Sequence, residues 1–197
     1  MTAPPHTVRP THAEIAAAAG RQVPDLLRPG LIVVFVGINP GLYSGAVGHH
    51  FARPGNRFWR ALHEGGLTPR VLRPDEERQL LPLGIGITNI VARATATAAQ
   101  LSPDELRAGA RSLERTLRRA RPAFAAVLGL GAYRTAFGRP RATAGEQPER
   151  IGETRVWLLP NPSGLNAHHQ PPDLARAFAE LARAAGYPAP RRRRSVG

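Results

Sequence analysis

Four short apolar runs stand out along the chain, and each is typical of a buried β-strand. They cover residues 31–36, 84–91, 123–128 and 154–159. Segments with helical spacing of apolar positions lie between them, so strands and helices alternate. This alternation predicts an α/β fold with three αβα layers, in which helices cover both faces of a central, mainly parallel four-stranded sheet.

Helix-end signals place the helices that would cover the sheet. The strongest is Ser102-Pro103-Asp104-Glu105, where serine suits the cap, proline the first helical position and glutamate the third. The helix that it opens is expected to reach Ala120. Further helices are expected at residues 13–20, 55–65, 73–81 and 172–185, with a short one ending at Phe137. Residues 138–152 are rich in proline, glycine and charge, and we expect them to form a surface loop.

The chain length of 197 residues fits one folded domain with extended ends. We expect residues 1–22 to be disordered apart from one short helix, and residues 23–187 to form the domain. Residues 188–197 contain four consecutive arginines and are expected to be a basic, disordered tail. Two interpretations of this tail stay open, namely phosphate binding without sequence choice and a simple solvated end.

Charge favours a polyanionic partner. All 27 basic residues are arginine and none is lysine, and with 14 acidic residues the formal net charge is +13. Arginine binds phosphate through a planar fork of N–H donors, so such an excess fits nucleic acid. A GC-rich genome can also replace lysine with arginine without a functional reason, and composition therefore gives only a hint.

The residues that the chain lacks exclude several kinds of chemistry. Without cysteine there is no disulfide, thiolate nucleophile, iron–sulfur cluster or cysteine-based zinc site. Without lysine no side chain can form a Schiff base, and the lysine of a P-loop is missing. No apolar run reaches transmembrane length and the first residues lack a signal-peptide pattern, so we expect a cytoplasmic protein without a membrane partner.

The loop after the first apolar run, residues 37–54, carries the candidate chemistry. Gly37 and Gly41 allow sharp turns and a close approach of the backbone to a ligand. Asn39 between them is a neutral amide, which can orient a water but is not a strong base. The alternative is an ordinary loop between a strand and a helix, with a capping asparagine and a core phenylalanine. Because the carboxyl ends of parallel strands share one edge of the sheet, the loop 160–170 is expected to face the loop 37–54.

Two weaker signals point elsewhere. Gly129-Leu130-Gly131 follows the third apolar run as in a dinucleotide-binding turn, but Arg134 stands where the third small residue belongs and no acidic residue follows at the ribose spacing. The adjacent pair His49-His50 lacks a third ligand nearby, which favours polar packing over a metal site. We therefore expect no metal and no cofactor.

Several motifs in the two loops together resemble one family. GINPG at residues 37–41, GHHF at 48–51, PGNRFW at 54–59 and LPNPSGLN at 159–166 occur in order, each in the expected strand or helix context. The chain resembles the mismatch-specific uracil/thymine DNA glycosylases of the uracil-DNA glycosylase superfamily. The similarity extends from about Leu31 to Ala182, and it implies a domain of this kind over residues 23–187.

The resemblance implies a role for each motif. Asn39 matches the catalytic residue that positions the attacking water. The base-binding positions that it implies are Ile38, Gly41, Ser44, His50, Phe51 and Asn161, with Phe51 stacking on the base. Leu165 matches a wedge that enters the DNA stack, and Gly164 and Asn166 match contacts to the opposite guanine. After them, Ala167-His168-His169 departs from an arginine found in some relatives, so the resemblance implies no direct arginine contact to the opposite strand here.

The function implied by the resemblance is base excision repair. A monomeric, monofunctional enzyme would bind double-stranded DNA with a mispaired or damaged base, flip out uracil, thymine or another damaged base opposite guanine, and leave an abasic site. Such a protein is expected in the cytoplasm, associated with the nucleoid. The alternative is a catalytically weak mismatch- or nucleotide-binding module of the same fold.

Overall fold

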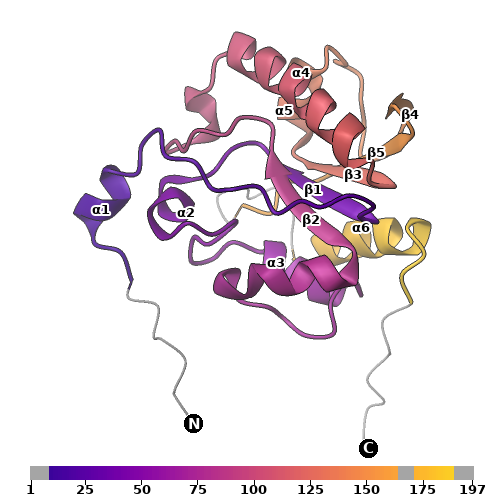
Figure 1. Cartoon of the computed structure of the whole chain (residues 1–197), viewed down its shortest axis with the longest axis horizontal. Helices are drawn as coiled ribbons and strands as arrows, with labels where there is room; N and C mark the ends of the chain where they lie inside the picture. The colour runs from indigo at the N-terminus through magenta and orange to yellow at the C-terminus, as the bar shows by residue number, and fades with distance from the viewer. Residues whose placement is uncertain (1–8, 164–170, 189–197) are drawn as a thin grey trace, which may run out of the picture.

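A central sheet organises the structure. The computed structural model describes residues 9–163 and 171–188. Its five strands follow the order β2-β1-β3-β5-β4 (Figure 1). In chain order they are β1 (Val33–Gly37), β2 (Ile85–Asn89), β3 (Phe124–Leu128), β4 (Gly145–Ile151) and β5 (Thr154–Leu159). Neighbouring strands are parallel except for β4, which runs antiparallel to β5. The prediction of a mainly parallel α/β sheet is confirmed.

The strand β4 corrects the prediction of four strands and of a surface loop at 138–152. It pairs with β5 from Gly145↔Leu158 to Ile151↔Thr154, with an irregular register between its ends. Of its side chains only Gln147 and Ile151 are buried. An edge strand needs few apolar residues and tolerates a proline such as Pro148 on its open side, so its sequence reads as a loop.

Helices cover both faces of the sheet as two layers, which Figure 1 shows above and below the strands. One face packs α4 (Pro103–Ala120) and α5 (Leu130–Ala136), and the other packs α3 (Phe58–Glu64), α6 (Pro171–Ala184) and the 3₁₀ helix η1 (Pro74–Leu83). Alternate residues of β1 enter different cores: Phe35 joins the α3 side, and Val34 and Val36 join the α4 side. A strand buried on both faces is apolar throughout, which is why these runs were visible in the sequence.

The helices agree with the sequence signals to different degrees. At the predicted start of α4, Ser102 Oγ accepts from the amide of Glu105 at 3.1 Å, and Glu105 Oε2 accepts from the amide of Ser102 at 2.9 Å. The first helix is shorter than expected, α1 (His12–Ala16), and the segment at 74–83 is a 3₁₀ helix. The loop 37–54 contains a helix that we did not expect, α2 (Leu42–Val47), and a 3₁₀ turn, η2 (Ala98–Gln100), precedes α4.

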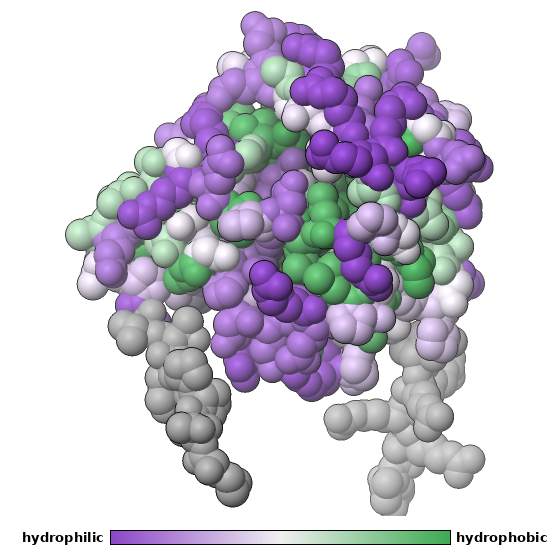
Figure 2. Space-filling view, in the orientation of Figure 1, coloured by the Kyte–Doolittle hydropathy of each residue, from purple (hydrophilic) through white to green (hydrophobic). Residues whose placement is uncertain are grey.

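Four parallel strands end at one edge of the sheet, and this edge gathers the loops that follow β1, β2, β3 and β5. The surface in Figure 2 is largely hydrophilic, with smaller apolar areas between the polar ones. Among the described residues, the only large hydrophobic side chains classed as exposed are Ile32 and Val71. Within residues 9–163 and 171–188, no helix has the length and apolar character needed to cross a membrane.

Candidate active site

A cavity of about 410 Å³ opens at the carboxyl edge of the sheet. This volume lies within the usual range of small-ligand sites. The predicted pocket residues that the structure describes all line it: Ile38, Asn39, Gly41, Ser44, His50, Phe51 and Asn161. Side chains that the sequence did not single out, Asn89 and Thr95 among them, line it as well. A second cavity, of about 380 Å³, lies between α4, α5 and β4 and contains none of the motif residues.

Hydrogen bonds fix the amide group of Asn39. Its Nδ2 donates to the backbone carbonyl of Arg93 at 3.0 Å and to Oγ1 of Thr95 at 2.7 Å. The Thr95 hydroxyl itself donates to the carbonyl of Thr97 at 2.8 Å, so towards Asn39 its oxygen acts only as an acceptor. Both partners of the amide are therefore acceptors, and the nitrogen must face them. The side-chain oxygen, which can only accept, is left for an occupant of the cavity.

Gly37 brings two walls of the cavity close together. A Cβ atom at this position would lie 2.4 Å from Oδ1 of Asn89 and 3.3 Å from Cζ of Phe51. Only glycine therefore leaves room for both side chains at the end of β1. Asn89 is the last residue of β2 and pairs directly with Gly37 in the sheet. Its amide makes no hydrogen bond within the described part of the chain, so both donor and acceptor are available at the cavity wall.

The aromatic wall is held by its neighbours. The ring of Phe51 stacks on that of Phe58, with centroids 4.0 Å apart and planes at 29°. The backbone of Phe51 has φ of 51°, a left-handed conformation that costs a bulky residue on the order of 1 kcal/mol or more. The next amide, that of Ala52, donates to Oγ of the buried Ser44 at 3.1 Å. Packing and hydrogen bonds thus maintain a strained residue at the site.

The carboxylate of Glu77, from a distant segment, anchors the two residues before Phe51. Glu77 Oε2 accepts from the amide of His50 at 3.0 Å and bonds its ring Nδ1 at 2.9 Å, while Oε1 lies 3.2 Å from Nδ1 of His49. Between the anchored amides of His50 and Ala52, the Phe51 amide has no acceptor among the described residues. In the part of the chain that the structure describes, no three acidic or histidine side chains are placed to hold a metal ion.

The second loop begins at the same cavity. Asn161 Oδ1 accepts from the amide of Ser163 at 2.9 Å, which shapes the turn after β5. Arg57 ties this turn to the start of α3, because its amide donates to the carbonyl of Pro162 at 3.1 Å and its Nη2 donates to the carbonyl of Ser163 at 2.8 Å. The wedge residues proposed from the sequence, Gly164, Leu165 and Asn166, lie outside the described residues.

A comparison with known families agrees with this geometry. The family described as the uracil DNA glycosylase superfamily matches residues 24–182, most of the chain. The chain belongs to the uracil DNA glycosylase superfamily. Membership assigns the general activity, release of uracil from DNA by a DNA glycosylase, and hence a role in DNA repair and DNA as the substrate.

The motifs placed both loops at the cavity, but they missed side chains that come from other segments. Asn89, Thr95 and Glu77 reach the site from segments far from the loop 37–54. The signal for Asn89 was a polar side chain near the carboxyl end of an apolar run, which is where sites of parallel sheets lie. Nothing in the local sequence distinguishes Glu77 from the other acidic residues at the start of η1.

Proposed function

We propose that this chain is a monofunctional, mismatch-specific glycosylase that removes uracil, and thymine or related damaged bases, from mispairs with guanine. The observation that carries the proposal is the fixed amide of Asn39 on the cavity wall. Its oxygen accepts a hydrogen bond from a water and orients that water toward the sugar. A carboxylate at this position would be a stronger base, and the neutral amide suits a reaction in which the glycosidic bond breaks first.

Charge development explains why weak bases suffice. As the bond breaks, the sugar becomes positive and the departing base negative, so N–H dipoles directed at the base oxygen stabilise the transition state. The Phe51 amide is a suitable donor, since it lies between two anchored amides and lacks an acceptor in the described structure. The ring of Phe51, packed on the fully buried ring of Phe58, provides a flat surface for a planar base.

Asn89 is the proposed reader of the base edge. An amide offers both a donor and an acceptor, and the imide edge of uracil or thymine presents a carbonyl and an N–H that match them. Cytosine presents the reverse arrangement at these two positions, so the amide orientation that matches uracil or thymine does not match cytosine. Asn89 lies beside Gly37 and Phe51, where such an edge would be within reach of the stacking surface.

Preference for mispairs follows from the cost of extruding a base. Unstacking and unpairing cost a few kcal/mol, and a mispair lowers that cost. An apolar wedge at Leu165 would offset part of it. With two neutral amides, Asn39 and Asn161, in the pocket motifs, we propose slow chemistry that depends on a destabilised pair and a good leaving group.

The absence of lysine supports the monofunctional assignment. Strand cleavage by β-elimination normally needs an amine that forms a Schiff base with the sugar, and no side chain of this sequence provides one. The product is therefore proposed to be an intact strand with an abasic site.

Single-turnover assays on labelled duplexes test the proposal. Uracil opposite guanine is expected to be released faster than uracil opposite adenine, and strands are expected to break only after alkali is added. Asn39→Ala is the matched variant, expected to bind the duplex and leave the base in place. Equal rates for the two pairs would overturn the mismatch preference, and trapping by borohydride would overturn the monofunctional assignment. Binding of mispairs by the wild type without base release would favour the binding-module alternative.

A further inference from the structure

Glu77 makes an unusually complete set of contacts for a residue outside the loop motifs. One carboxylate accepts from the His50 amide, from the His50 ring and from the His49 ring, at 3.0, 2.9 and 3.2 Å. These partners lie 27 and 28 residues away in sequence. The side chain of Glu77 is 12% exposed and that of His50 is 2% exposed, so the contact is largely shielded from water. Shielding makes these hydrogen bonds stronger than surface ones.

The charge of Glu77 determines which ring nitrogen of His50 carries the proton. Burial raises the pKa of the Glu77 carboxyl, but hydrogen bonds from His50 and His49 outweigh it and keep this pKa below its ordinary value. An ionised carboxylate can only accept, so Nδ1 of His50 must donate. In the neutral ring, Nε2 then carries a lone pair. This atom is buried and has no hydrogen-bond partner among the described residues.

A buried lone pair without a partner costs free energy, and such atoms often mark a binding surface. His50 lines the cavity that contains Asn39 and Phe51. Since Nδ1 is committed to Glu77, Nε2 is the only ring nitrogen that His50 can offer to an occupant of this cavity. The ring cannot turn over without breaking its bond to the carboxylate.

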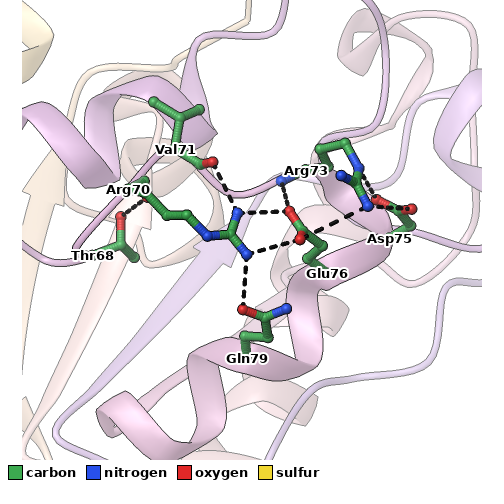
Figure 3. Close-up of polar contacts among 7 residues, drawn as sticks. All are labelled: Thr68, Arg70, Val71, Arg73, Asp75, Glu76 and Gln79. Atoms are coloured by element: carbon green, nitrogen blue, oxygen red, sulfur yellow. Dashed lines mark hydrogen bonds and ion pairs between the residues drawn. The ribbon is translucent and has the colours of Figure 1, made fainter. Parts of the chain in front are cut away.

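The residue before Glu77 is tied to the segment that precedes η1. Figure 3 shows the preceding residue, Glu76, accepting from Nη1 and Nη2 of Arg70 at 2.9 and 2.8 Å and from the amide of Arg73 at 2.8 Å. Arg70 also donates to Gln79 at 3.1 Å. The first turn of η1 is thereby tied to the segment before it. Glu77 is the next residue of this turn, so the network restrains the backbone from which its side chain reaches His49 and His50.

We propose that Glu77 is a positioning residue of the base pocket, which holds His50 with Nε2 as a hydrogen-bond acceptor for an N–H group of the extruded base. The same carboxylate anchors the His50 amide and so helps to direct the Phe51 amide. This inference rests on the proposed function, because it concerns the base that the pocket receives. It adds to that function a residue from η1 and a defined protonation pattern at His50.

Kinetics provide the first test. Glu77→Gln keeps the shape but removes the charge and one acceptor oxygen, and we expect the maximal single-turnover rate on a G·U duplex to fall at least about tenfold, with the half-saturating enzyme concentration unchanged. The maximal single-turnover rate of His50→Ala should fall by a similar factor. Glu64→Gln, which removes a surface partner of Arg60 on α3, is the matched control and should keep the wild-type rate. Thermal unfolding of each variant checks that it is folded.

Nitrogen-15 spectra of the histidine rings provide a readout that a merely structural role would not change. Above the range in which histidine ordinarily titrates, the wild type should show His50 with its proton on Nδ1. A guanine-opposed duplex with uncleavable 2′-fluoro-deoxyuridine should shift Nε2 of His50, while the same duplex with a tetrahydrofuran abasic analogue should not. Glu77→Gln should show a mixture of the two protonation patterns.

The outcomes separate this inference from the proposed function. If the wild type releases uracil and folded Glu77→Gln does so equally fast, the positioning role is wrong while the glycosylase assignment stands. A proton on Nε2, or identical spectra with the uracil analogue and the abasic duplex, would also overturn the role. If the wild type releases no base, the proposed function fails, and the spectra still decide whether His50 contacts an extruded uracil.

Discussion

Nδ2 of Asn39 lies 2.7 Å from Oγ1 of Thr95, and the Thr95 hydroxyl donates a hydrogen bond to the carbonyl of Thr97 at 2.8 Å. Because Oγ1 of Thr95 can then only accept from Asn39, the amide of Asn39 has a single favourable orientation. Thr95 is 5% exposed, so the relationship is protected from competing water. The proposed catalytic group therefore depends on a segment more than fifty residues away from it in the chain.

Replacing Thr95 by valine tests that dependence. The substitution keeps the shape but removes the acceptor for Asn39, at a cost of about 1 kcal/mol for one hydrogen bond. We expect the single-turnover release of uracil to slow by roughly fivefold, which corresponds to that free energy, while duplex binding stays unchanged. Thr135→Val on α5, which removes only a bond to the carbonyl of Gly131, is the control. A wild-type rate for the Thr95 variant would show that the orientation of the amide does not limit base release.

Asn39→Asp should not produce a better enzyme in this setting. One carboxylate oxygen would face the carbonyl of Arg93, which lies 3.0 Å from the present Nδ2 and cannot donate. We expect the free energy of unfolding to fall by about 1–3 kcal/mol, the cost of an unpaired buried polar group. The loss should grow as pH rises and the new carboxyl ionises, and thermal unfolding between acidic and neutral pH measures it. Gln79→Glu is the contrasting amide-to-acid change, because Gln79 accepts from Arg70 and the new charge should be tolerated.

Gly37→Ala should damage the cavity more than the fold. The added Cβ would lie 2.4 Å from Oδ1 of Asn89, and that amide must move away. We expect a loss of about 1–3 kcal/mol of stability from overpacking, and a larger proportional loss of uracil release because Asn89 is displaced. Gly131→Ala on α5 is the control, since a Cβ there meets nothing within 4 Å and alanine favours a helix. Equal activity of the two variants would contradict the close approach at Gly37.

The lowered pKa of Glu77 predicts that its contribution to the free energy of unfolding depends on pH. Burial raises its pKa in the folded protein, but the hydrogen bonds from His50 and His49 and the charge interaction with His50 together outweigh burial and lower the pKa. The stabilisation is therefore fully present above the unfolded carboxyl value of about 4.3, and it is lost as pH falls through the folded value. The difference in melting temperature between wild type and Glu77→Gln should be largest near neutral pH and shrink in acid. A difference that grows in acid would mean that the carboxyl is protonated in the native state.

Local sequence was sufficient to predict an element where the pattern of residues is specific to that kind of element. The apolar runs predicted strands buried on both faces, the capping residues at 102–105 predicted the start of a helix, and the structure has both. The strand β4 was missed because an edge strand shows little of this pattern, and α2 was missed because glycine and proline around it resemble a continuous loop.

The sequence by itself determined the α/β class, the superfamily motifs and the placement of Asn39, Phe51 and Asn161 at one edge of the sheet. Only the tertiary structure decided how those groups are oriented. The amide of Asn39 is fixed by Arg93 and Thr95, and the ring of His50 by Glu77. Motifs record which side chains follow a strand, whereas hydrogen bonds between segments distant in the chain depend on packing that no local pattern encodes.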